Sequence, residues 1–271
     1  MKRFVFMISD GTGITVESLG NSLLTQFEGI EFDKQTLPYI DTLEKATELL
    51  AQINHSYETT GQKSLVFMTL VNPDICLLIK QSKACVFDLF NTFLDPLEQE
   101  LQTKSSDTIG RAHGLADDKV YEHRIKAIDY ALTYDDGVKI AGYKQADIIL
   151  IGVSRSGKTP SCLYMALQFG VFAANYPFTD DDLSDFRLPQ SLRPFKNKLF
   201  GLTIDPQRLQ YIRTERRPNS RYASPEQCRI EVTEVETMYQ LENIPYINST
   251  HFSIEEIATK IMSIFEIQRR I

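Results

Sequence analysis

One octapeptide has the residue types and spacing of a loop that binds phosphate. It reads Gly152-Val153-Ser154-Arg155-Ser156-Gly157-Lys158-Thr159. Its glycines allow a tight turn that points several backbone amides into one concavity, and the positive end of the following helix also attracts anions. In the pattern GxxxxGK(S/T) the lysine neutralises terminal phosphates and the threonine hydroxyl ligates Mg²⁺. We therefore predict that all eight residues bind a nucleotide, with Lys158 catalytic and Thr159 a metal ligand.

The sequence around this loop has the elements that must position it. The continuous apolar run Ala146–Ile151 is typical of a central parallel strand. A helix is predicted over Lys158–Phe169, with Pro160 in its first turn and Gly170 as its stop. The structural alternative is a glycine-rich turn that binds nothing.

A nucleotide site of this kind commonly has a carboxylate at the end of a neighbouring strand. Asp205 follows the predicted strand Lys198–Ile204, so we predict it as the second, catalytic Mg²⁺ ligand. Capping of the helix that follows Asp205 is the alternative, because aspartate is a preferred residue at helix N-termini.

Two further features suit anions. Ser9–Gly13 follows a buried strand and precedes a helix, where open α/β sheets bind ligands, and predicts a second anion pocket or a simple tight turn. A cluster of arginines in an acidic chain predicts a phosphoryl clamp, a dock for an acidic or phosphorylated partner, or a solvated helix face. The cluster comprises Arg208, Arg213, Arg216, Arg217 and Arg221.

Short apolar runs alternate with amphipathic stretches throughout, which is the pattern of α/β architecture. Strands are predicted over Lys2–Ile8, Ser64–Val71, Ala84–Phe87, Ala146–Ile151, Lys198–Ile204 and Ile244–Ile247. Helices are predicted over Thr15–Phe27, Thr42–His55, Pro73–Gln81, Lys119–Tyr134, Lys158–Phe169, Pro225–Glu242 and Ser253–Arg269. The polar stretch Gln102–Lys119 is predicted to be irregular.

The turn Asp135–Gly137 is the predicted domain boundary. We expect an N-terminal α/β domain over residues 1–137, and a C-terminal α/β domain over residues 138–271 with the loop and a mostly parallel sheet. The helix before the boundary has a predicted apolar side, formed by Val120, Ile125, Ile128 and Leu132.

Composition excludes several classes of protein. A hydrophobic share of 42% and a charged share of 24% are ordinary for a soluble globular chain. No apolar run approaches the ~18 residues of a membrane span, and the net charge of −7 argues against binding nucleic acid. The four cysteines are scattered without metal-ligand spacing, so we expect reduced thiols and a cytoplasmic location.

Six segments together resemble one known family. They are Phe6–Gly13, Tyr121–Gly137, Gly152–Pro160, Ala174–Phe178, Gly201–Pro206 and Asn219–Ala223. Their combination resembles the bacterial phosphoenolpyruvate synthase regulatory proteins, relatives of the pyruvate, phosphate dikinase regulatory proteins. The resemblance extends along nearly the whole chain.

The resemblance implies a bifunctional serine/threonine kinase and phosphorylase whose protein substrate is phosphoenolpyruvate synthase (pyruvate, water dikinase). ADP would phosphorylate and inactivate the target at a threonine beside its catalytic histidine. Inorganic phosphate would remove that phosphoryl group as pyrophosphate. In such a reaction Asp10, Asp135 or Asp136 would orient the acceptor hydroxyl, and the Ser9–Gly13 turn or the arginine cluster would receive inorganic phosphate.

Two other classes of function remain open on the residues alone. An ATP-dependent kinase or ATPase would need no target protein. A non-catalytic nucleotide sensor would bind through Lys158 without changing the mass of a partner. The residues also leave the oligomeric state open, a homodimer included.

Overall fold

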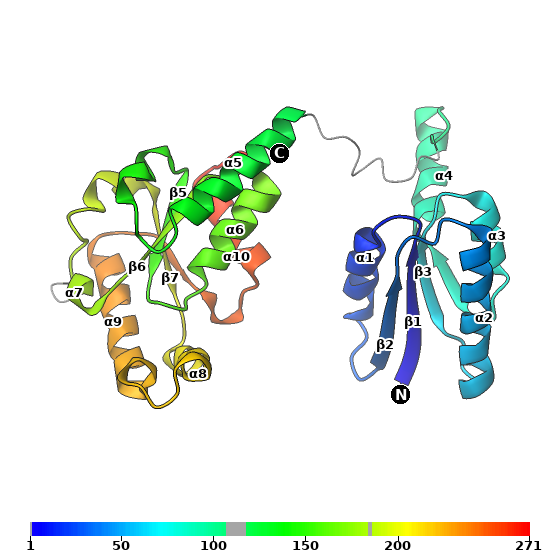
Figure 1. Cartoon of the computed structure of the whole chain (residues 1–271), viewed down its shortest axis with the longest axis horizontal. Helices are drawn as coiled ribbons and strands as arrows, with labels where there is room; N and C mark the ends of the chain where they lie inside the picture. The colour runs from blue at the N-terminus through cyan, green and yellow to red at the C-terminus, as the bar shows by residue number, and fades with distance from the viewer. Residues whose placement is uncertain (1, 107–117, 184–185) are drawn as a thin grey trace. The chain divides into compact units, whose positions relative to one another are not determined.

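The computed structural model describes residues 2–106, 118–183 and 186–271 (Figure 1). The chain forms two compact units, Met1–Gly114 and Leu115–Ile271. Most of the stretch predicted to be irregular, Gln102–Lys119, lies outside the described residues. Within the described ranges, no helix combines the length and the apolar character that crossing a membrane requires.

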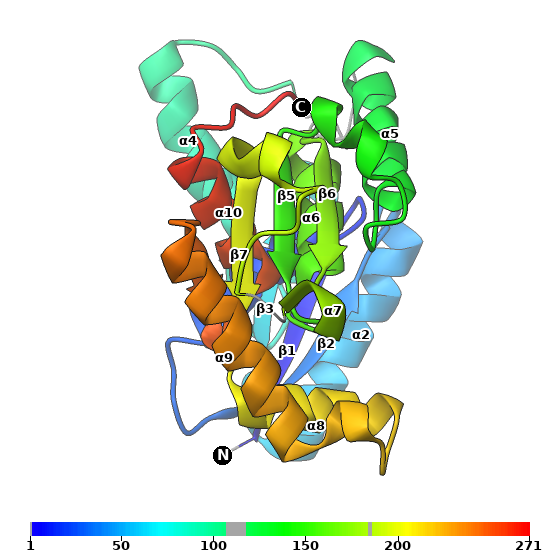
Figure 2. The same ribbon diagram turned by 90° about the vertical axis from the view of Figure 1, so that its left-hand side faces the viewer.

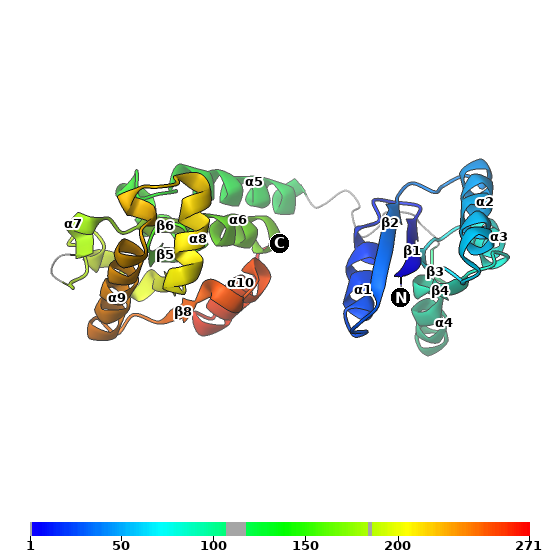
Figure 3. The same ribbon diagram turned by 90° about the horizontal axis from the view of Figure 1, so that it is seen from below.

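The described part of the first unit contains a sheet of parallel strands in the order β2-β1-β3-β4. The strands are β1 (Lys2–Ser9), β2 (Glu31–Leu37), β3 (Leu65–Thr69) and β4 (Cys85–Asp88). The helices are α1 (Ile14–Leu24), α2 (Leu43–Thr60), α3 (Pro73–Lys80) and α4 (Leu89–Leu101). Side chains of β1 alternate between the faces. Phe6 and Ile8 pack with α2 and α3, whereas Val5 and Met7 pack with α1 on the other face (Figure 3).

The second unit repeats this plan with parallel strands in the order β6-β5-β7-β8. The strands are β5 (Ile148–Gly152), β6 (Ala173–Pro177), β7 (Leu199–Thr203) and β8 (Tyr246–Asn248). The helices are α5 (Asp118–Thr133), α6 (Lys158–Phe169), α7 (Asp180–Leu183), α8 (Pro206–Arg216), α9 (Pro225–Leu241) and α10 (Ile254–Ile264). Ile149 and Ile151 pack with α9, whereas Ile148 and Leu150 pack with α6 and α10 on the opposite face (Figure 2).

The predicted α/β class is confirmed, and each predicted strand and helix has a counterpart. Helix α6 has the predicted bounds. Strands β2 and β6 and helices α4 and α7 have no counterpart in the prediction, and α8 corresponds only to the alternative in which Asp205 caps a helix. Strand β2 is an edge strand without a buried residue, so it shows no apolar alternation. Helix α4 contains Pro96, which interrupts the usual helical signal.

The apolar side predicted for α5 is wrong at two of its four positions, whereas Ile128 is partly buried and packs against the core as predicted. Ile125 and Leu132 are exposed, and Ala127 and Ala131 are buried in the core that α5 shares with α6. Because the alanines are small and four residues apart, they let α5 lie close to α6. This packing also explains why α5 belongs to the second unit, so that the chain divides before α5 and not at the Asp135–Gly137 turn.

Gly201, in β7, allows a close contact between the sheet and α9. A Cβ atom at Gly201 would lie 2.7 Å from ring atoms of Tyr239, whose side chain is fully buried. The Tyr239 hydroxyl donates a hydrogen bond to the Ile151 carbonyl oxygen at 3.0 Å, so the ring cannot move freely. The glycine therefore fixes how α9 covers β5, the strand that leads into the predicted phosphate-binding loop.

We expect Gly201→Ala to lower the free energy of unfolding by about 1–3 kcal/mol, because overpacking displaces a hydrogen-bonded ring. Urea denaturation followed by circular dichroism measures this change. Gly11→Ala is the control, since a Cβ atom there would meet only the Ser9 hydroxyl oxygen, at 3.9 Å. Equal stability of the two variants would contradict the role of Gly201.

Candidate phosphate-binding site

The predicted loop connects β5 to α6 at the carboxyl end of the strand. Gly152 approaches β7 so closely that a Cβ atom would lie 2.2 Å from the Leu202 carbonyl oxygen, which explains the glycine. Arg155 has a φ of 77°, a left-handed conformation that costs a non-glycine residue about 1–2 kcal/mol. The Ser156 hydroxyl oxygen is buried and has no hydrogen-bond partner among the described residues. A strained backbone and an unsatisfied hydroxyl are typical of a loop shaped for a ligand.

The side chain of Lys158 folds back onto this loop. Its ammonium group donates hydrogen bonds to the carbonyl oxygens of Gly152, at 3.1 Å, and Val153, at 2.8 Å. Burial lowers the pKa of Lys158 to about 8, although the nearby carboxylates of Asp136 and Asp135 act in the opposite direction. The Lys158 ammonium group, which is predicted to neutralise phosphate, therefore lies inside the loop.

Asp135 is the carboxylate that contacts Thr159. The Thr159 hydroxyl donates to Asp135 Oδ1 at 2.9 Å, and the side-chain amide of Asn175 donates to the same oxygen. Asn175 is on β6, and its side-chain carbonyl accepts a hydrogen bond from the backbone amide of Asp136 at 3.2 Å. Asn175 thereby fixes the turn after α5 beside the start of α6. Our sequence reasoning missed Asn175, whose only signal was its place in the Ala174–Phe178 segment of the family resemblance.

Asp205 forms the helix cap that the sequence offered as an alternative. Its carboxylate accepts hydrogen bonds from the amides of Gln207, at 2.9 Å, and Arg208, at 3.0 Å, at the start of α8. The carboxylate paired with Thr159 is Asp135, and Asp205 does not line the cavity beside the loop. In the described ranges, no cluster of three or more His, Cys, Asp or Glu residues is arranged to hold a metal ion.

A cavity of about 270 Å³ lies beside the loop. Its charged lining consists of three cations and one carboxylate: Arg155, Lys158, Arg216 and Asp136. Thr159 also lines it. The excess of positive charge, together with the free amides at the start of α6, makes the cavity suitable for a phosphorylated ligand.

The arginine cluster divides into residues with different roles. Arg213 has no exposed side-chain surface, and its guanidinium forms hydrogen bonds of 3.0 and 2.6 Å with the Glu231 carboxylate. Burial alone would lower the pKa of Arg213, but the bonds and charge of Glu231 hold it above the usual value. A direct phosphate clamp by Arg213, which the sequence allowed, is therefore wrong. Arg216 lines the cavity, whereas Arg217 is exposed outside it.

Arg213 also ties the loop to its neighbours. It donates to the carbonyl oxygens of Ser154, at 3.2 Å, and Tyr222, at 3.1 Å. Its guanidinium carbon lies 4.2 Å from the centre of the Tyr222 ring, and the Tyr222 and Ser154 hydroxyl oxygens are 3.0 Å apart. These contacts connect the loop to α8, α9 and the short 3₁₀ helix Arg221–Ala223.

Asp10 and the Ser9–Gly13 segment, which were also predicted as site residues, lie in the first unit. Asp10 is buried at the end of β1, where its carboxylate accepts a hydrogen bond from the Val71 amide at 2.7 Å. Burial raises the pKa of Asp10, and the bond from Val71 opposes this change. The Gly11 amide bonds the Ser9 hydroxyl at 3.1 Å, so the Ser9–Gly13 segment has the contacts of a tight turn.

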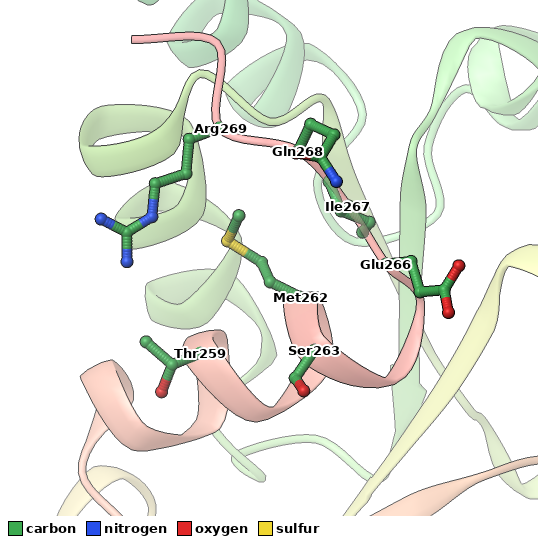
Figure 4. Close-up of a pocket in the computed structure, with 7 residues that line it drawn as sticks. All are labelled: Thr259, Met262, Ser263, Glu266, Ile267, Gln268 and Arg269. Carbon is green, nitrogen blue, oxygen red and sulfur yellow. The ribbon is translucent and has the colours of Figure 1, made fainter.

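A second cavity of about 590 Å³ lies along α10 (Figure 4). Glu266 and Arg269 supply charges of opposite sign to its lining. The Arg269 guanidinium lies 4.7 Å from the centre of the Phe169 ring, which accounts for its position. This cavity is larger but has no excess charge and no phosphate-binding turn. The cavity beside Lys158 is therefore the candidate site.

Fold and site together define a class: an α/β protein with a loop of the GxxxxGK(S/T) type in a cationic cavity, suited to a phosphorylated ligand. Comparison with known proteins identifies the family. A model of the kinase/pyrophosphorylase family matches residues 5–262, and the chain belongs to that family. Its activity is accordingly that of a phosphotransferase, and the resemblance noted in the sequence is confirmed.

Curated relatives match over the full length of the chain. A protein of Legionella pneumophila (strain Corby) that is named as a phosphoenolpyruvate synthase regulatory protein is 67% identical over 271 residues, which cover 100% of both chains. Proteins of the same name from Hahella chejuensis and Pseudomonas aeruginosa (strain LESB58) are 57% and 55% identical. These two alignments cover 100% of this chain, and 100% and 98% of the relatives.

We expect Glu231→Gln to lower the free energy of unfolding by roughly 3 kcal/mol, because it leaves the buried Arg213 guanidinium without a neutralising charge. Glu226→Gln, an exposed position in the first turn of the same helix, should cost less than about 1 kcal/mol. Urea denaturation measures both values. A loss for Glu231→Gln no larger than for Glu226→Gln would show that the ion pair does not hold this region together.

Proposed function

We propose that this chain is an ADP-dependent protein threonine kinase and a phosphate-dependent phosphorylase that regulates phosphoenolpyruvate synthase. The main support is the cationic cavity beside Lys158 in a chain of the kinase/pyrophosphorylase family. The names of the relatives support phosphoenolpyruvate synthase as the protein substrate.

In the kinase direction, the loop amides and Lys158 would hold the diphosphate of ADP. The target threonine oxygen attacks the β-phosphorus, and the bond from that phosphorus to the bridging oxygen breaks. AMP leaves with the electron pair, and the threonine proton passes to a base. Asp136, which lines the cavity, is the carboxylate we assign to orient the hydroxyl. Catalysis then depends on positioning and charge stabilisation, as is usual for phosphoryl transfer.

The phosphorylase reaction would use the positions that the two phosphates of ADP and the target threonine occupy in the kinase reaction. An oxygen of inorganic phosphate attacks the phosphothreonine phosphorus, the bond to the threonine oxygen breaks, and that oxygen takes up a proton. In-line geometry places the attacking and leaving groups on opposite sides of the phosphorus. Inorganic phosphate would therefore occupy the position of the α-phosphate of ADP, and pyrophosphate would leave from the loop. We accordingly place the phosphate site at the loop and not at Ser9–Gly13.

The residues present fit Mg²⁺, which prefers oxygen ligands and usually keeps several waters. Thr159 and Asp135, whose side-chain oxygens are 2.9 Å apart, would hold it beside the diphosphate. When bound, the ion would neutralise charge on the phosphate oxygens.

Incubation of the full chain with purified phosphoenolpyruvate synthase, ADP and Mg²⁺ should add one phosphoryl group to a threonine of the synthase. Inorganic phosphate, added after ADP is removed, should erase it and release pyrophosphate. Mass spectrometry of the synthase and an assay for pyrophosphate measure the two steps. Lys158→Met should slow both by about 10²-fold or more, because it removes charge stabilisation of the phosphates. Lys144→Met, an exposed position in the same unit, is the control.

Two outcomes would overturn this proposal. Transfer from ATP with none from ADP would indicate an ordinary kinase. Binding of ADP, measured by calorimetry, without any change in the mass of the synthase would indicate a nucleotide sensor.

Replacement by asparagine at Asp135 and at Asp205 distinguishes which of the two carboxylates binds Mg²⁺. Asp135→Asn should lower the transfer rate by about 10²-fold and raise the Mg²⁺ concentration for half-maximal rate, because it removes a charged oxygen beside Thr159. Asp205→Asn should leave both within about threefold, since asparagine also caps helices. Titration of activity with Mg²⁺ measures both. A larger effect at Asp205 would return the metal role to that residue.

A further inference from the structure

Two arginines on α8 lie three residues apart and have opposite surroundings. Arg213 is fully buried, and Glu231 neutralises its charge. Arg216 lines the cavity that also contains Lys158, and no carboxylate among the described residues forms an ion pair with it. The fold thus accounts for the charge of Arg213 and leaves that of Arg216 available to a ligand.

Neighbouring residues on α8 anchor the backbone that carries Arg216. Ile212 and Arg216 are one turn apart on α8, so they lie on the same face of the helix, and both line the cavity. Arg213, between them in sequence, anchors α8 to the loop through the Ser154 carbonyl oxygen. A helix held in this way presents Arg216 to the site at little cost in conformational entropy of the backbone.

On the basis of the proposed function, we propose that Arg216 is a catalytic residue whose guanidinium contacts the migrating phosphoryl group in the transition state. Lys158 and Thr159 approach the ligand from the loop and the start of α6, whereas Arg216 approaches from a separate element, α8. In phosphoryl transfer, charge spreads over the equatorial oxygens of the migrating group, and an arginine supplied within the same chain can stabilise it. Arg155 belongs to the loop itself and is not assigned this role.

The migrating phosphoryl group is the part that both reactions share. In the kinase direction its bond to the AMP oxygen breaks as its bond to the threonine oxygen forms, and the threonine proton goes to the base. In the phosphorylase direction the bond to the threonine oxygen breaks as the bond to inorganic phosphate forms, and the threonine oxygen regains a proton. A residue that stabilises the group in transit must therefore accelerate both reactions by a similar factor.

The experiment compares R216Q with R217Q in the full chain. Both variants remove one arginine charge, but Arg217 is an exposed residue outside the cavity lining. R216Q should lower kcat in both directions by about 10²-fold or more. Its Kd for ADP, measured by calorimetry, should change by less than about threefold, because the interaction forms in the transition state. R217Q should match the wild type. R216K should recover part of the rate, since it keeps the charge without the two-pronged geometry.

Three results would overturn the role of Arg216 while leaving the proposed function intact. These are a kcat of R216Q close to that of the wild type, an equal loss in R217Q, and a loss confined to one direction or to ADP affinity. A wild-type protein that transfers phosphoryl groups in neither direction would overturn the proposed function, and the catalytic role of Arg216 with it.

Discussion

The buried ion pair between Arg213 and Glu231 is the contact on which the candidate phosphate-binding region depends. A guanidinium without access to water must be neutralised and must satisfy its donors, or its burial costs several kcal/mol. Glu231 supplies the charge and bonds both terminal nitrogens, and the carbonyl oxygens of Ser154 and Tyr222 accept further hydrogen bonds, so that Nε alone among the guanidinium nitrogens has no partner in the described part of the chain. Because these partners belong to the loop, the Arg221–Ala223 turn and α9, satisfying one side chain fixes three segments relative to one another.

The loop itself shows what an anion would change. Lys158 now bonds to the carbonyl oxygens of Gly152 and Val153, and the Ser156 hydroxyl oxygen has no partner among the described residues. Phosphate oxygens are better acceptors for an ammonium group than backbone carbonyls, since they carry charge. A phosphorylated ligand would therefore satisfy groups that the protein alone satisfies poorly or not at all. This supports a site that is shaped before its ligand arrives.

The sequence alone determined the α/β class, the strand before the loop and the exact extent of α6. These are local properties, which can be recognised without knowledge of the tertiary contacts. They are an apolar run of five or six residues, glycines at the turn and Gly170 at the helix end. The combination of motifs also indicated the family. Strand β2 was not predictable in this way, because an edge strand with no buried residue has no apolar pattern.

Only the tertiary structure decided which charged side chains act together. The sequence favoured Asp205 as the carboxylate that acts with Thr159. In the structure, parallel pairing of β5 with β6 brings Asn175 beside Asp135 and directs that carboxylate to Thr159, while Asp205 caps α8. Likewise, five arginines in one segment look alike until α8 is packed, when Arg213 turns inward to Glu231 and Arg216 lines the cavity. The reason is physical: residue type sets what a side chain can bind, whereas burial and the partners available depend on contacts between segments distant in the chain.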